Sequence, residues 1–379
     1  MVLAQEKKKK SAVKRLLLLL VVLVLIVTAY ANRRHFSTGS IRDWFSEISM
    51  SRQKGDGYPL TLSGNTVLSF NELNGDPALL TDTAFLIYNG SGREIVNRQH
   101  GYGNAGMSVT RQYALLYDTD GTGYKLETKA RTLFQKELTQ KIISGAVSPS
   151  GVHALATLSK GYLGEVTVFD LKEEQLYKWY SADANIFAVA LNEKGDRLAV
   201  ATVNTDKGEV KSSLLVFDFG KKEPIAQFSY PGTLILDVSY LDKNTVALVG
   251  DNKYITFTGP NKGDDVVYDY SGRHLTGYSL RQGTGAALLL SQYADNRSPS
   301  LVQINVKGAT AFQKDNSDQI RDVFLGEKTT FLLMDRHIIR YTAAGEEKSK
   351  TDTADDSLRL AEVNGKLFVL SLSELRVEK

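Results

Sequence analysis

Eight short apolar runs recur along the chain, and their spacing constrains the fold more than any other feature. Successive runs begin 36, 40, 45, 48, 40, 44 and 37 residues apart. Their first residues are Ala78, Ala114, Ala154, Ala199, Ala247, Ala287, Phe331 and Phe368. Strand-like runs with a period of about 40 to 45 residues are typical of β-propeller blades, because one small twisted sheet buries its faces only against neighbouring sheets in a ring. We therefore expect an all-β propeller.

Two neighbouring copies of the repeat match most closely. Residues 143–148, 154–158 and 168–170 of one copy correspond to 187–192, 199–203 and 216–218 of the next, at offsets of 44, 45 and 48 residues. Apolar and polar residues alternate over 165–168, which favours strands over a helix. Each copy therefore predicts a four-stranded meander, with strands at 143–148, 153–158, 165–170 and 176–180 in the first and at 187–191, 197–203, 213–218 and 225–228 in the second.

The two ends of the repeat region predict how the ring closes. Three strands are expected at 358–363, 366–372 and 375–377, after which the sequence stops, and 58–63 forms a lone strand before the first complete repeat. Pairing the lone strand with the last three would complete an eighth sheet and remove the exposed edges of an open array. We therefore predict eight blades, with seven as the alternative if a weaker repeat is miscounted.

A basic leader and an apolar run precede the repeats. Six Lys and Arg residues lie within 1–15, and 16–31 holds sixteen uncharged residues. As a helix this run reaches ~24 Å, slightly less than the ~30 Å hydrocarbon layer, so flanking side chains would complete the span. The positive-inside rule places the leader in the cytoplasm and the repeats outside it. The alternative is a signal peptide cleaved after Ala31, followed by secretion.

Residues 32–57 are predicted to connect the apolar run to the propeller. Apolar residues at helical spacing indicate a short amphipathic helix that Ser40 would cap, and they are Ile41, Trp44, Phe45 and Ile48. This helix would dock at the membrane surface or on a partner, or would be a spacer that leans on the propeller. The expected organisation is a leader at 1–15, a transmembrane helix at 16–31, a juxtamembrane segment at 32–57 and a propeller at 58–379.

Composition excludes several classes of protein. The chain has 46 Lys and Arg against 43 Asp and Glu, and removing the six basic residues and one acidic residue of the leader leaves 40 against 42. The remainder is close to neutral, which argues against nucleic-acid binding. The chain has no cysteine, so disulfides, thiolate metal sites and cysteine nucleophiles are excluded. The five histidines are dispersed without metal-binding spacing.

Three short patterns resemble ligand-binding motifs. Residues 101–106 match G-x-G-x-x-G, but 107–117 predicts a strand in place of the helix that dinucleotide binding needs, which favours an inter-blade loop. Residues 118–127 resemble a calcium loop, but the spacing of Glu127 is wrong, which favours a hairpin turn. The aspartate pairs at 264–265 and 355–356 could hold a cation in a lactonase-like hydrolase, although such pairs are usually solvated turns.

Aromatic and polar side chains in the expected loops are the candidates for a binding surface. They are His100, Tyr102, Asn104, Tyr162 and Trp179. Such groups suit the recognition of sugars or peptides, although Tyr162 and Trp179 could equally pack between sheets. The sequence predicts no catalytic residue, no metal ligand and no cofactor. Only two tryptophans occur, which argues against a quinone-dependent dehydrogenase.

Several segments together carry a family resemblance. They are the basic leader, the leucine run and residues 58–64, 161–170, 177–179 and 191–200. On these the chain resembles, over nearly its whole length, the single-pass propeller proteins of Gram-positive bacteria known as a domain of unknown function. The resemblance implies a topology and no chemistry. Individual blades also resemble those of WD-repeat proteins and quinoproteins, with Phe169-Asp170 and Phe217-Asp218 in place of the Trp-Asp pair.

These observations predict a membrane-anchored propeller outside the cytoplasm that acts as a binding or scaffolding module of the cell envelope. Its partner would be an envelope protein or a glycan. The alternative is a hydrolase, lactonase-like or carbohydrate-acting, whose residues meet at the central channel only in the folded chain.

Overall fold

The computed structural model describes residues 38–62, 64, 66–259, 265–294 and 298–378, and divides the chain into two compact units, 1–52 and 53–379. In the first unit the described residues form one helix, α2 (Thr38–Ser51), which confirms the expected helix but begins before its expected cap, Ser40. Within the described ranges, no helix has the length and apolar character needed to cross a membrane. The predicted leader and transmembrane run, 1–15 and 16–31, lie outside them.

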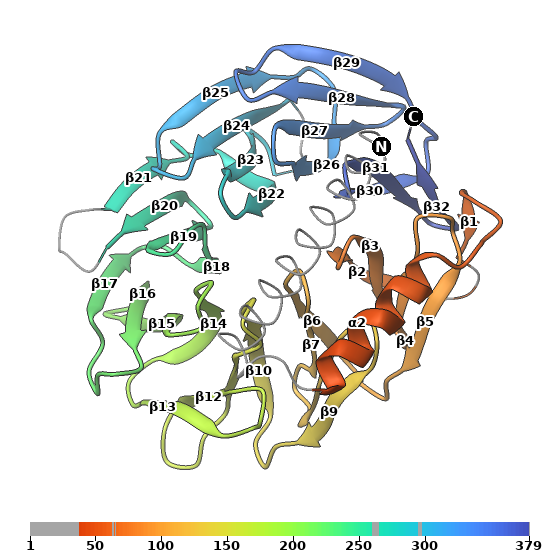
Figure 1. Cartoon of the computed structure of the whole chain (residues 1–379). Helices are drawn as coiled ribbons and strands as arrows, with labels where there is room; N and C mark the ends of the chain where they lie inside the picture. Colours follow the sequence, from red (N-terminus) through yellow and green to blue (C-terminus); the bar gives the residue numbers. More distant parts are fainter. Residues whose placement is uncertain (1–37, 63, 65, 260–264, 295–297, 379) are drawn as a thin grey trace, which may run out of the picture. The chain divides into compact units, whose positions relative to one another are not determined.

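The second unit is a β-propeller of eight four-stranded antiparallel sheets (Figure 1). Blade 1 contains β2 (Val67–Leu73), β3 (Asp76–Thr81), β4 (Ala84–Tyr88) and β5 (Glu94–Gln99). Blade 2 contains β6 (Ala105–Val109), β7 (Ala114–Asp118), β8 (Gly123–Glu127) and β9 (Thr132–Glu137). Blade 3 contains β10 (Ile142–Val147), β11 (His153–Thr157), β12 (Gly164–Phe169) and β13 (Gln175–Ser181). Blade 4 contains β14 (Asn185–Leu191), β15 (Arg197–Asp206), β16 (Glu209–Asp218) and β17 (Ala226–Pro231).

The other half of the ring repeats this arrangement. Blade 5 contains β18 (Ile235–Tyr240), β19 (Thr245–Gly250), β20 (Lys253–Thr258) and β21 (Asp265–Asp269). Blade 6 contains β22 (His274–Arg281), β23 (Gly285–Ser291), β24 (Pro299–Asn305) and β25 (Thr310–Asp315). Blade 7 contains β26 (Ile320–Leu325), β27 (Thr329–Met334), β28 (His337–Thr342) and β29 (Glu347–Asp352). Blade 8 contains β30 (Ser357–Val363), β31 (Lys366–Ser371), β32 (Glu374–Val377) and β1 (Leu60–Thr61).

The apolar runs that predicted the repeat are the second strands of the blades. The first residues of all eight runs lie in β3, β7, β11, β15, β19, β23, β27 and β31, and each is at most 2% exposed. The first strand of each blade lies closest to the axis (Figure 1). A second strand is therefore enclosed by neighbouring strands on both sides and by neighbouring blades on both faces, which explains why it is continuously apolar.

The eighth blade closes the ring as predicted, so eight blades are confirmed and seven are excluded. Leu60 pairs with Leu375, and Thr61 pairs with Glu374, in an antiparallel register. The closing strand is shorter than the expected 58–63. Because its partner strand lies at the other end of the sequence, this pairing joins the two ends of the repeat region and leaves the ring without an open gap.

The segment before β1 is bound to the turn between β4 and β5. The Gln53 carbonyl accepts hydrogen bonds from Asn89 Nδ2 at 2.8 Å and from Ser91 Oγ at 2.9 Å. The Gly57 N–H donates to the Ser91 carbonyl at 2.9 Å. Gln53 and Gly57 therefore belong to the compact propeller unit.

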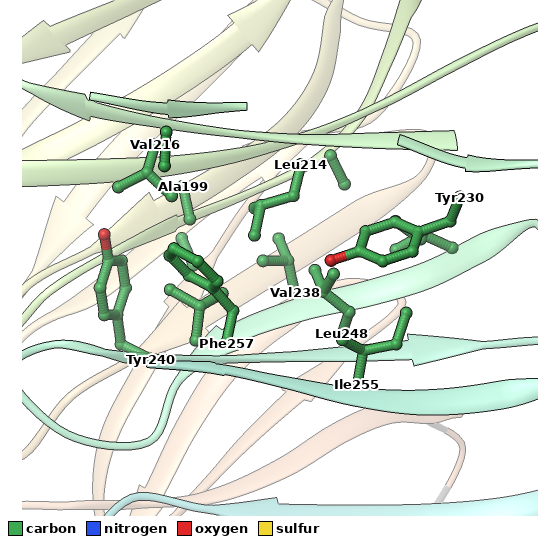
Figure 2. Close-up of a cluster of buried hydrophobic side chains, with 14 residues drawn as sticks. Ala199, Leu214, Val216, Tyr230, Val238, Tyr240, Leu248, Ile255 and Phe257 are labelled. Atoms are coloured by element: carbon green, nitrogen blue, oxygen red, sulfur yellow. The ribbon is translucent and has the colours of Figure 1, made fainter. Parts of the chain in front are cut away.

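Neighbouring blades pack through apolar side chains. Between blades 4 and 5, Leu214 and Val216 of β16 face Val238, Leu248 and Phe257 of blade 5 (Figure 2). Each of these side chains is at most 4% exposed. Burying one side chain of this size contributes roughly 1.5–3 kcal/mol, so the stacked blades stabilise one another far more than any single sheet could stabilise itself.

Blades 1 and 2 also meet through buried charges. Lys129 binds the Asp76 carboxylate, and both residues are at most 5% exposed. Glu127, which is fully buried, lies 2.6 Å from Arg98 Nη1 and 3.3 Å from Lys125 Nζ. Removing one partner from such a pair leaves an uncompensated buried charge, which typically costs about 3–5 kcal/mol. This interface therefore depends on intact ion pairs as well as on apolar packing.

Candidate ligand site at the propeller axis

The first strands carry an irregularity that repeats around the axis. Within the described strands, seven of the eight first strands show a register shift near their beginning. In β18 the shift lies between Ile235 and Asp237, and in β26 it lies between Ile320 and Asp322. Such shifts re-aim side chains and are frequent beside functional sites. The fold therefore places an aspartate at the same position of the repeat in blades 5 and 7.

A cavity of about 620 Å³ lies at the axis and is lined by the first strands of blades 2, 3, 4 and 5. We call it the axial cavity. Hydroxyl groups of Ser108, Ser144 and Ser239 line it, and Arg111 and Glu193 contribute from the turns between the first and second strands. The cavity therefore reaches the face of the ring that carries these turns, which we call the first-turn face.

Tyr117 of β7 reaches the cavity because two glycines make room for its ring. A Cβ atom on Gly106 would lie 2.5 Å from Tyr117 Cε2, and one on Gly145 would lie 2.9 Å from Tyr117 Cδ1. Gly106 is the last glycine of the G-x-G-x-x-G match and lies in β6. Residues 101–104 of the match form part of the loop between blades 1 and 2, and strands follow it in place of a helix, as predicted. Burial raises the pKa of Tyr117, and the charge of Asp237 raises it further.

Asp237 is a cavity-lining carboxylate that is bound by neutral donors. Its Oδ1 accepts a hydrogen bond from the Val238 N–H at 2.8 Å, and its Oδ2 accepts one from the Tyr278 hydroxyl at 3.3 Å. Burial raises the pKa of Asp237 to about 6, against the opposing effect of these hydrogen bonds. No Lys or Arg in the described part of the chain forms an ion pair with it. The group can therefore receive a cation or exchange a proton near neutral pH.

Asp322, at the same repeat position in blade 7, joins two blades. Its Oδ2 accepts a hydrogen bond from the Leu360 N–H of blade 8 at 2.7 Å. Burial raises the pKa of Asp322 to about 6, while bonds from the N–H groups of Leu360 and Val323 and the charge of Arg359 oppose this shift. Asp322 does not belong to the lining of the axial cavity.

Three of the binding residues predicted from the sequence lie in the loop between β5 and β6. The rings of His100 and Tyr102 stack with centroids 5.2 Å apart. A ring nitrogen of His100, Nε2, lies 3.0 Å from the Thr81 carbonyl oxygen, and burial lowers the pKa of His100. The backbone N–H of Asn104 donates to Asp118 Oδ1 at 2.9 Å. The fold therefore gathers these three residues on the face opposite the first-turn face.

The other two predicted residues have different surroundings. Tyr162 lies in the turn between β11 and β12, is 48% exposed and contacts the Tyr180 ring at a centroid distance of 4.8 Å. Trp179 packs against Phe217 with ring centroids 5.1 Å apart, in the apolar interface between blades 3 and 4. Packing between sheets was the alternative that the sequence left open for Trp179. None of the five predicted residues lines the axial cavity.

The remaining motifs take structural positions. Residues 118–127 form the hairpin of β7 and β8, as predicted. Asp265 begins β21, the outer strand of blade 5, and residues 355–356 lie between β29 and β30, whereas residue 264 is outside the described ranges. His153 is buried with its Nε2 3.0 Å from Glu173 Oε1. Among the residues that the structure describes, no three His, Asp or Glu side chains are grouped to hold a metal ion.

Comparison with known proteins identifies a family and a fold. The Family of unknown function (DUF5711) matches residues 55–378. No curated protein matches the sequence. BamB from Moraxella catarrhalis is similar in structure, with a TM-score of 0.53 and 10% identity over 85% of this chain and 99% of that one. Sqt1 from Saccharomyces cerevisiae is similar with a TM-score of 0.58 and 10% sequence identity, over 86% of this chain and 100% of that one. The C-terminal WD40 domain of Sif2 is similar with a TM-score of 0.59 and 11% sequence identity, over 84% of this chain and 96% of that one. At these identities the likeness shows a WD40-like propeller fold.

Proposed function

We propose that this chain, which belongs to the Family of unknown function (DUF5711), is a membrane-anchored binding or scaffolding module whose propeller works outside the cytoplasm, in the bacterial cell envelope. The axial cavity carries the binding role in this proposal. Its volume of about 620 Å³ falls in the range of ordinary ligand sites, and its hydroxyl groups and carboxylate suit a polar ligand. The closed ring holds these groups rigidly, which lowers the entropy cost of binding. The proposed ligand is a segment of a partner protein.

The proposed location rests on the basic leader and the apolar run at 16–31. Because the chain has no cysteine, a single introduced thiol reports its own compartment without background. Leu372 is 74% exposed between β31 and β32, so the variant Leu372→Cys should react with a membrane-impermeant maleimide on intact cells. The matched variant Ser11→Cys should react only after lysis. Reaction of Ser11→Cys alone on intact cells would reverse the proposed orientation.

The binding role can be tested by comparing the two faces of the ring. Gln282 lines the axial cavity from the first-turn face, whereas Tyr162 is exposed on the opposite face. A photoreactive amino acid at position 282 should form a cross-link to one partner polypeptide, identified by mass spectrometry of the joined peptides. Cross-links that form only from position 162 would instead assign binding to the face that carries His100, Tyr102, Asn104 and Tyr162.

A second candidate function is a hydrolase, and Asp237 is the observation that favours it. A carboxyl group with a pKa of about 6 in a cavity suits a general acid or base, and Glu193 supplies a second carboxylate to the lining. A panel of lactone and glycan substrates tests this function. Turnover by the full chain that is lost in Asp237→Asn and kept in Asp322→Asn would favour the enzyme over the binding module.

A further inference from the structure

We propose that the axial cavity recognises a cationic side chain, a lysine or an arginine of a partner protein, and that Asp237 receives it. This inference rests on the proposed binding role of the cavity and specifies the chemistry of the partner. It follows from the unused bonding capacity of one carboxylate, from the groups around that carboxylate and from the space in front of it.

Asp237 has bonding capacity that the described chain does not use. An ionised carboxylate offers about four lone-pair positions. The two hydrogen bonds to it come from a backbone N–H at 2.8 Å and from a tyrosine hydroxyl at 3.3 Å, and the second is long for an O–H donor. Burial raises the pKa of Tyr278, so its hydroxyl stays protonated and supplies no charge. The carboxylate can therefore accept further bonds from a charged donor.

Three other carboxylates, each with a side chain at most 10% exposed, have cationic partners. Glu127 lies 2.6 Å from Arg98 Nη1, and Asp76 binds Lys129. Glu173 lies 3.0 Å from Lys136 Nζ. A buried charge without a partner is unfavourable, and proteins usually pair it or neutralise it. Asp237 and Asp322 are half-buried and form no ion pair with a described residue. Of these two carboxylates only Asp237 lines the cavity, where a ligand can supply the missing cation.

The groups that face Asp237 from other strands suit a cation. Tyr278 approaches from β22, and Tyr117 of β7 is close enough for the Asp237 charge to affect its pKa. The Tyr278 hydroxyl oxygen and the Ser239 hydroxyl of the lining can accept hydrogen bonds from ammonium and guanidinium groups. The charged residues of the lining, Arg111 and Glu193, lie in turns at the first-turn face. A lysine or arginine entering from that face would place its charged end among oxygen atoms.

The cation contact makes binding depend on pH. Lys and Arg keep their charge at neutral and mildly acidic pH, whereas Asp237 must be ionised to attract them. A carboxyl group that titrates at pH 6 is about tenfold more ionised at pH 7 than at pH 5, so affinity should fall about tenfold over this range. Burial raises the pKa of Tyr117 and of Tyr278, so neither hydroxyl changes protonation in this window. Arg111 and Glu193 line the cavity from the turns, whereas Asp237 lies on β18.

A peptide selection tests the proposal even though the partner is unidentified. A phage-displayed random peptide library is selected at pH 7 on the full chain in detergent, and the best peptide is synthesised and titrated. We expect the enriched peptides to share a Lys or Arg. The dissociation constant should rise at least tenfold for Asp237→Asn and stay within about twofold for Asp322→Asn, which has the same repeat position outside the cavity.

A change in the peptide tests the same contact without altering the protein. Replacing the shared Lys by norleucine, or the shared Arg by citrulline, should weaken binding at least tenfold to the unaltered chain. Enriched peptides without a basic residue, competing with one another and cross-linking from position 282, would overturn the cation proposal and leave the binding role intact. Peptides that cross-link only from position 162 would overturn both.

Discussion

Asp237 and Asp322 occupy the same position of the repeat, but their carboxylates are used differently. Each follows the register shift of a first strand, and burial raises each pKa to about 6. Asp322 binds a backbone N–H of the next blade, whereas Asp237 binds a tyrosine hydroxyl. Tyr278 and Leu360 also occupy matching positions, one residue after the shift in the following blade. The same position of the repeat therefore serves two purposes. Asp322 links two blades through a backbone hydrogen bond, whereas Asp237 keeps lone pairs for a further hydrogen-bond donor.

The largest expected effect is on the stability of Asp237→Asn. The substitution removes a half-buried carboxylate that lacks a cation, while the amide keeps one oxygen for the Val238 N–H. We expect the free energy of unfolding at pH 7.5 to rise by about 1–3 kcal/mol, because a pKa shift of one unit corresponds to about 1.4 kcal/mol. Urea denaturation measures this change. A clear loss of stability would show that the Asp237 carboxylate is already satisfied in the free protein.

The pH dependence of the stability of Asp237→Asn tests whether the pKa of Asp237 is raised. The folded chain keeps a proton on Asp237 between about pH 4 and pH 6 that the unfolded chain has released. The contribution of this carboxyl group to stability is therefore complete below about pH 4 and is lost as the pH rises through 6. The stability advantage of Asp237→Asn should grow from pH 4 to pH 7.5. A constant difference over this range would contradict the raised pKa.

The Asp322→Asn variant should have a lower free energy of unfolding than the Asp237→Asn variant. An amide has one acceptor oxygen, whereas the Asp322 carboxylate serves the N–H groups of both Leu360 and Val323. Leaving one buried N–H without a partner costs about 1–3 kcal/mol, so Asp322→Asn should be less stable than Asp237→Asn by roughly 1–2 kcal/mol. Parallel urea titrations at pH 7.5 compare the two variants. Equal stabilities would remove the structural distinction between the two positions.

The Tyr278→Phe variant should show the smallest change in stability. The variant removes the hydroxyl that donates to Asp237 at 3.3 Å and keeps the ring. Because this hydrogen bond opposes the upward shift, the pKa of Asp237 should rise above about 6, and stability at pH 7.5 should fall by roughly 0.5–1.5 kcal/mol. NMR titration of the carboxyl carbons checks the pKa. An unchanged Asp237 titration would show that the long bond has no energetic role.

The sequence predicts the ring better than it predicts the cavity. The runs that begin at Ala78 through Phe368 and the lone strand before them are local patterns, and local patterns gave the number of blades and the closure. Tyr117, Asp237 and Tyr278 lie in blades 2, 5 and 6, and only the closed ring brings them together. The repeated Ile-x-Asp-Val of 235–238 and 320–323 was the available signal, but it does not distinguish the two aspartates.

The most direct test of the central claim is the titration of Asp237 with and without a bound cation. Carboxyl-carbon NMR on the full chain should give a pKa of about 6 for Asp237 in the free protein. Saturation with the selected lysine or arginine peptide should move that pKa towards the ordinary value of about 3.9 and leave Asp322 unchanged, because an adjacent cation favours the ionised form. An Asp237 titration that is identical with and without the bound peptide would contradict the account.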